Sequence, residues 1–117
     1  MPPTLADRLV HILEAINDIQ TLLYGKTAAA FGADKFARMA VERSFEIISE
    51  ASRRIPEDLK ARELEIDLRA MANIGNRLRH AYHRVDANLL WQFAERDLPP
   101  LKSFIERVIK DVGGMNS

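Results

Sequence analysis

Apolar residues recur every three or four positions near the start of the chain, which is the spacing of one face of a helix. Thr4 is suited to cap this helix at its N-terminus, and Gly25 is suited to end it. The apolar positions are Leu5, Leu9, Ile12, Leu13, Ile16, Ile19 and Leu23. The pattern predicts an amphipathic helix from Leu5 to Leu23.

A second helix is predicted between Asp34, a good N-cap residue, and Pro56, which disfavours helical geometry in the residue before it. Its predicted apolar side consists of Phe36, Met39, Ala40, Ile47 and Ile48. Its charged side consists of Glu42, Arg43, Glu46, Glu50 and Arg53. The segment PEDLKARE then predicts a short helical turn, because proline stands at its first position and acidic residues follow.

A third helix is predicted after Asp67, another suitable N-cap residue. One side of it is the stripe Leu68, Met71, Gly75, Leu78 and Tyr82, whose members are three or four residues apart. The other side carries Arg69, Asn73, Asn76, Arg77, His80 and Arg84. The helix therefore separates an apolar packing side from a side rich in nitrogen-bearing groups.

The last part of the chain predicts one or two further helices. Asp86 can cap a fourth helix that contains Leu89, Leu90 and Phe93. The segment DLPPL interrupts this pattern before LKSFIERVIKDV resumes it up to Gly113, either as a fifth helix or as a continuation across a proline kink. No segment of useful length shows the alternation of apolar and polar residues that is typical of a strand. We therefore expect an all-α antiparallel bundle of four to five helices, in one domain over residues 1–117.

Composition narrows the possible functions. Seventeen basic residues balance seventeen acidic ones, so any contact with a polyanion must be local. The absence of cysteine agrees with a reducing compartment, and no apolar run suggests a secretion signal or a membrane span, so we expect a cytoplasmic protein without membrane contact. The sequence has no Gly-rich phosphate loop, HExxH or GxSxG motif, and we expect no cofactor.

The segment GNRLRHAYHRV gathers the groups that could carry chemistry. Asn76 and Arg77 precede His80 by four and three residues, so all three share one helix face, with Asn73 one turn further back. Histidine can take and give protons near neutrality, and arginine can bind phosphate. Cleaving RNA without a metal needs a base for the ribose 2′-hydroxyl, a cation for the phosphate and an acid for the leaving 5′-oxygen. This one helix face offers two of these three groups. A two-fold axis in a dimer would bring a second copy of the face to the same cleft.

A simpler interpretation of the same residues stays open. His80 and the arginines could form a solvated helix end, where positive charge is favoured, and Tyr82 could be an ordinary core aromatic residue. His80 and His83 are three residues apart and could chelate a metal, but no carboxylate shares their helix face, so we expect no metal site.

In the order and spacing of four blocks, the chain resembles the HepT-like toxins of the HEPN superfamily. The blocks are DRLVHILEAINDIQTLLYG, AVERSFEIISEASRRIP, IGNRLRHAYHRVD and LLWQFAERDLPPLKSFIE. The family signature is an arginine, four to six residues, and then His-x-Tyr or a similar ending. His-x-Tyr corresponds here to His80 and Tyr82, and the asparagine that often follows the arginine corresponds to Asn76.

The signature arginine is absent at its usual spacing, because Asn73, Ile74 and Gly75 occupy the positions where it would stand. Arg77 is the better substitute, since it lies one turn before His80 on the same face, whereas Arg79 points elsewhere. Glu50 matches a recurrent acidic position of the family's second helix. It would either orient an arginine or histidine of the third helix or form a surface ion pair.

The resemblance implies the toxin component of a type VII-like toxin–antitoxin module: a homodimeric, metal-independent endoribonuclease with its site in the dimer cleft. It implies as partner a minimal nucleotidyltransferase antitoxin encoded beside it, which in some such pairs adenylylates the tyrosine that corresponds to Tyr82. Two alternatives remain. The chain could be a non-catalytic partner subunit of a nucleotidyltransferase that lost cleavage with its arginine, or an unrelated helical dimer without a nucleic-acid role.

Overall fold

The N-terminal helix α1, Leu5–Leu23, forms as the sequence predicts. In the computed structural model, which describes residues 4–56, 58 and 87–115, the Thr4 hydroxyl accepts a hydrogen bond from the Asp7 amide at 3.1 Å. The Asp7 carboxylate in turn accepts one from the Thr4 amide at 2.9 Å, which completes a capping box. The turn that follows the helix contains Gly25, whose φ of 74° lies in the left-handed region that glycine adopts without strain.

A short helix that the sequence analysis did not predict follows this turn. Helix α2, Ala28–Ala33, is capped by the Thr27 hydroxyl, which accepts a hydrogen bond from the Ala30 amide at 3.1 Å. It contributes one large side chain, Phe31, which is fully buried. Six residues are too few to show a helical period, so only the threonine cap could have indicated this element.

Helix α3, Lys35–Ser52, begins at the predicted cap and ends before Pro56, but its predicted apolar side is wrong. Phe36 is 79% exposed and Met39 is 53% exposed. Ala40 and Ile47 are half-buried, and of the predicted set only Ile48 is fully buried. The buried side consists instead of Ala37, Val41, Ser44, Phe45, Ile48, Ser49, Ala51 and Ser52. Small residues allow a neighbouring helix to approach closely. Because serine counts as polar, a hydropathy pattern does not identify a buried side that contains three serines.

The C-terminal region is one continuous helical run. Helix α6, Ala87–Gln92, passes into a π-helical segment η1, Phe93–Asp97, and then into α7, Leu98–Met115. The amide of Leu98 donates to the carbonyl of Phe93, five residues back. Pro99 and Pro100 stand in the first turn of α7 and lack the amide hydrogens that would continue a regular ladder. Of the two predicted possibilities the run is thus the continuation, and it extends past Gly113.

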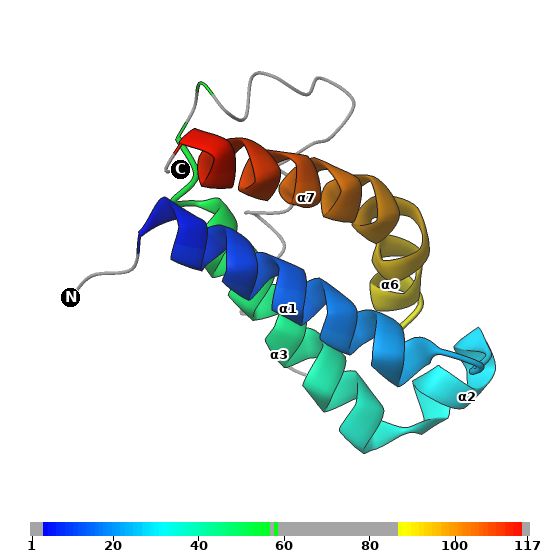
Figure 1. The fold of residues 1–117 in the computed structure, drawn as a ribbon. Helices are drawn as coiled ribbons and strands as arrows, with labels where there is room; N and C mark the ends of the chain where they lie inside the picture. Colours follow the sequence, from blue (N-terminus) through cyan, green and yellow to red (C-terminus); the bar gives the residue numbers. More distant parts are fainter. Residues whose placement is uncertain (1–3, 57, 59–86, 116–117) are drawn as a thin grey trace.

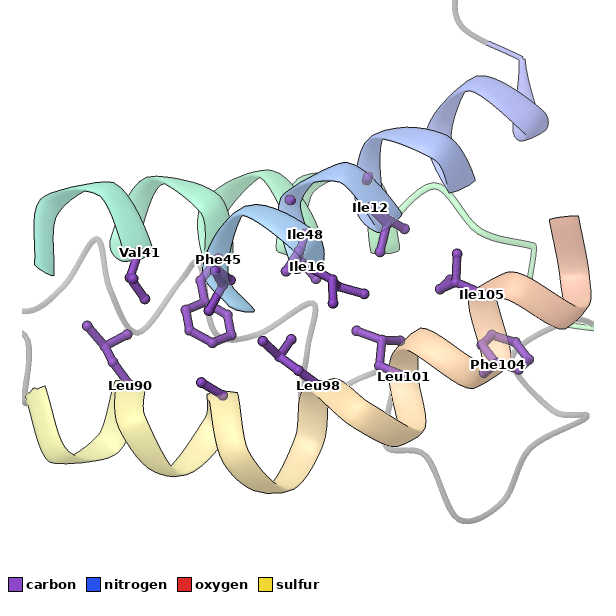
Figure 2. Close-up of a cluster of buried hydrophobic side chains, with 14 of the residues drawn as sticks. Ile12, Ile16, Val41, Phe45, Ile48, Leu90, Leu98, Leu101, Phe104 and Ile105 are labelled. Atoms are coloured by element: carbon purple, nitrogen blue, oxygen red, sulfur yellow. The ribbon is translucent and has the colours of Figure 1, made fainter. Parts of the chain in front are cut away.

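The described elements are all helical and enclose one apolar core. Figure 1 shows α3 and α7 packed along α1, with both running opposite to it. Figure 2 shows how side chains of α1 and α3 meet those of α6 and α7. The buried cluster includes Leu9, Ile12, Ile16, Ile19, Val41, Phe45, Ile48, Leu90, Leu98, Leu101, Phe104 and Ile105. The all-α prediction is confirmed. No described helix is long and apolar enough to cross a lipid bilayer.

Candidate functional site

Most residues of the predicted catalytic site lie outside the described residues. These are Asn73, Asn76, Arg77, Arg79, His80 and Tyr82, together with His83, the predicted third helix and all of the PEDLKARE turn except Pro56 and Asp58. Their assignment rests on the sequence and stays a prediction. Glu50 is the one predicted site residue whose surroundings the structure describes.

Glu50 lies in the last turn of α3 and forms two ion pairs within that end of the helix. Its carboxylate is 3.8 Å from the Arg53 guanidinium and 3.5 Å from that of Arg54. All three side chains are well exposed, so these pairs contribute little to stability. These contacts are surface ion pairs, which is one of the two alternatives predicted for Glu50. The supporting role toward the third helix stays a prediction.

The buried side of α3 carries a row of hydroxyl groups that the sequence analysis overlooked. Ser44 donates to the carbonyl of Ala40 at 3.0 Å. Ser52 is fully buried, and its hydroxyl has no hydrogen-bond partner in the described part of the chain. Such a group costs free energy of folding, on the order of 1–3 kcal/mol. Ser44, Ser49 and Ser52 all lie on the buried side of α3, a pattern that becomes visible in the sequence once serine is counted as a small residue.

Glu42 and Glu46 place two carboxylates one turn apart on α3. Partial burial is the main cause that raises the pKa of Glu42, the neighbouring Glu46 raises it further, and Arg38 acts in the opposite direction. The Glu46 carboxylate also forms an ion pair with Arg43 at 3.2 Å. Glu42 therefore binds its proton more tightly in the folded state than in the unfolded chain.

Replacing Glu42 by glutamine should stabilise the protein near neutral pH. Because the folded pKa of Glu42 is raised, the charged side chain opposes folding at neutral pH, and this opposition disappears as pH falls through the folded pKa toward the unfolded value of about 4.5. Urea unfolding of Glu42→Gln and wild type should thus differ near neutrality and converge in acid. Glu106→Gln, at an exposed position of α7, is the matched control. A loss of stability at neutral pH would contradict the expectation.

A pocket that no sequence motif indicated opens between the end of α1 and the α6–η1 run. It has a volume of about 220 Å³. Its lining includes Gln20 and Leu23 of α1, Tyr24 and Lys26 of the following turn, and Trp91 and Glu95 of the C-terminal run. We call it the Trp91 pocket. Its lining residues come from two distant parts of the sequence, so only the packed helices bring them together.

The described residues contain no group of three or more His, Asp or Glu side chains placed to hold a metal ion. The Trp91 pocket is lined by aromatic, cationic and carboxylate side chains, and the ion pairs of α3 join a carboxylate to two guanidinium groups. The expectation of a metal-free site at His80 stays a prediction.

The fold and these features define the class as a small all-helical protein. The sequence model of the Ribonuclease HepT-like family matches residues 12–108. The chain belongs to this HepT-like family.

Its relatives cover nearly the whole chain. It is 40% identical over 104 residues to "Probable ribonuclease HepT" of Thermococcus cleftensis, an alignment that covers 89% of this chain and 94% of that protein. It is 32% identical over 106 residues to MJ1216 of Methanocaldococcus jannaschii, whose name assigns it as an RNase, with 91% and 88% covered. No solved structure matches the chain. The family resemblance seen in the sequence is confirmed.

Proposed function

We propose that this protein is a ribonuclease that cleaves RNA at a site built around His80. The observation that carries the proposal is the family match over residues 12–108, which includes the complete GNRLRHAYHRV segment. The names of the relatives from Thermococcus cleftensis and Methanocaldococcus jannaschii support the same activity. The residues of that segment supply a proton acceptor and a phosphate-binding cation, two of the three groups that RNA cleavage needs.

The proposed reaction needs no metal. His80 accepts the proton of the ribose 2′-hydroxyl, the 2′-oxygen attacks the neighbouring phosphorus, and the bond from phosphorus to the 5′-oxygen breaks. Arg77 binds the phosphate and stabilises the negative charge that develops on it, with Asn76 beside it and Asn73 and Arg79 as possible supporting groups. The leaving 5′-oxygen takes a proton from an acid. The products are a 2′,3′-cyclic phosphate and a 5′-hydroxyl end.

The proposal includes a homodimer, because one helix face supplies only two of the three required groups. A two-fold axis would place a second copy of the face across a shared cleft and supply the acid. The protein would then be the toxin of a type VII-like toxin–antitoxin module. Its minimal nucleotidyltransferase antitoxin would attach adenylyl groups to Tyr82, and the added phosphate charge would repel RNA.

A second candidate function follows from the missing signature arginine. The positions four to six residues before His80 hold no arginine, so the chain could be a non-catalytic partner that binds the nucleotidyltransferase without cutting RNA. It would then co-purify with the nucleotidyltransferase and leave RNA intact even at high protein concentration.

The proposal is tested by incubating the purified protein with total RNA in the presence of a metal chelator. We expect cleavage with 5′-hydroxyl ends, and we expect cleavage to disappear after incubation with the neighbour-encoded nucleotidyltransferase and ATP. Intact mass should then show added adenylyl groups, and peptide mapping should place them on Tyr82. Cleavage that depends on added metal would contradict the mechanism. Intact RNA together with a stable complex would favour the non-catalytic partner.

A further inference from the structure

The Trp91 pocket has the composition of a site for one nucleotide unit. Trp91 and Tyr24 provide two aromatic rings, and Lys26 provides a cation. Ligand pockets for drug-sized molecules have volumes of about 300–1,000 Å³. At about 220 Å³ this pocket is smaller, which suits a single planar ring rather than a larger ligand.

The Trp91 ring is fixed before any ligand arrives. Its ring centroid lies 5.9 Å from that of Phe31, which is fully buried, at an interplanar angle of 38°. Trp91 also lies two residues before the start of η1, and π-helical turns within helices are frequent at functional sites. A base that stacks on a fixed ring requires little further ordering of the protein.

Tyr24 is an aromatic side chain whose exposure the fold does not explain. It is 90% exposed, although it belongs to the pocket lining and follows the last turn of α1. Exposed aromatic rings at a pocket are the usual platform for bases of single-stranded nucleic acid, because every base offers a π-face. Tyr24 is therefore placed to cover one face of a bound base.

The charges around the pocket also fit a nucleotide. Lys26 is 3.8 Å from Asp34, a loose pair that leaves its ammonium group available to a phosphate. Lys102 lies outside the lining and donates a hydrogen bond at 3.3 Å to Gln20, which is part of it. Glu95 contributes a carboxylate, which accepts hydrogen bonds from amino groups on base edges.

We propose that the Trp91 pocket binds one unpaired nucleotide of the RNA substrate, with its base against Trp91 and Tyr24 and its phosphate at Lys26. This inference rests on the proposed ribonuclease function, and it adds a binding subsite made of residues outside the GNRLRHAYHRV segment. The subsite would hold a single-stranded segment while the neighbouring strand is cut.

The test uses the intrinsic fluorescence of Trp91, the only tryptophan of the chain. The probe is a short single-stranded 2′-O-methyl oligoribonucleotide, which lacks the hydroxyl that attacks phosphorus and so stays intact. We expect the probe to quench Trp91 emission. Tyr24→Ala and Lys26→Gln should each weaken binding about fivefold or more, as the loss of one stacking or phosphate contact predicts.

Two controls match these substitutions. Phe36→Ala removes another exposed aromatic ring, and Lys110→Gln removes another lysine, both outside the pocket lining. Both should bind the probe like wild type. Tyr24 is preferred to Trp91 as the target, because Trp91 packs on buried Phe31 and its loss would disturb the fold.

The outcomes separate the subsite from the proposed function. Fluorescence anisotropy could show that the probe binds wild type, Tyr24→Ala and Lys26→Gln with equal affinity and without quenching Trp91. This result would overturn the subsite. Cleavage of ordinary RNA by the same protein would still uphold the ribonuclease function. Neither binding nor cleavage of RNA would overturn both. Quenching by the nucleotidyltransferase but not by the probe would assign the pocket to a protein partner and overturn the nucleotide proposal.

Discussion

Replacement of His80 by alanine is expected to lower the rate of RNA cleavage by about 10²–10⁴-fold, the usual contribution of a general acid or base. If both copies of His80 act in the dimer, as base and as acid, the loss lies at the upper end. Expression of the variant should no longer arrest growth. The measurement is the initial rate of cleavage of a labelled RNA, with a parallel plating assay.

The matched control for His80→Ala is His11→Ala. His11 is an exposed residue of α1, outside both the family motif and the Trp91 pocket. It should keep wild-type cleavage and toxicity, and circular dichroism should show that both variants remain helical. Undiminished cleavage or toxicity in His80→Ala would contradict the catalytic assignment.

The sequence predicted α1 accurately because several independent signals coincide there. The Thr4 cap, the apolar period and Gly25 all specify the same helix, and the structure shows the cap, the buried stripe and the positive φ that they imply. Helices with local signals of this kind need little tertiary information. The same holds for the start of α3 at Asp34, whose carboxylate accepts a hydrogen bond from the Ala37 amide at 3.1 Å.

The orientation of α3 could not be predicted in the same way, because tertiary packing decides it. Large apolar side chains at Phe36 and Met39 suggested one side, whereas the structure buries the side on which Phe45 and Ile48 alternate with small residues such as serine and alanine. Close helix contact favours small side chains over hydrophobic ones. The pocket at Trp91 escaped prediction for a related reason, since its lining exists only after α1 and α6 are packed.

The candidate residues of the site, unlike the orientation of α3, can be proposed from local sequence alone. His80, Arg77 and Tyr82 were identified from their chemistry and from family spacing, and both depend only on local sequence. What local sequence cannot supply is the position of a second copy of the motif across a two-fold axis. The relative placement of Glu50 and the motif likewise depends on how helices pack.

The largest expected effect on stability is that of Phe45→Ala in α3. Phe45 is fully buried, and Figure 2 shows it pointing from α3 toward the side where Leu90 and Leu98 lie. Its ring also meets Phe93 edge-on, with centroids 6.2 Å apart. Removing a buried phenylalanine costs about 3–5 kcal/mol, a large part of the roughly 5–15 kcal/mol that stabilises an ordinary domain. Urea unfolding should show a much lower midpoint.

Phe36→Ala is the matched control, because it removes the same ring from the same helix at a position that is 79% exposed. It should change the free energy of unfolding by no more than about 0.5 kcal/mol. The pair therefore distinguishes the two possible orientations of α3. If Phe36→Ala were the costlier substitution, the helix would present the side that its hydropathy pattern predicts, and the core in Figure 2 would be wrong. A large loss at Phe45 with little change at Phe36 means that α3 buries the side that carries Phe45 and leaves the side of Phe36 in solvent.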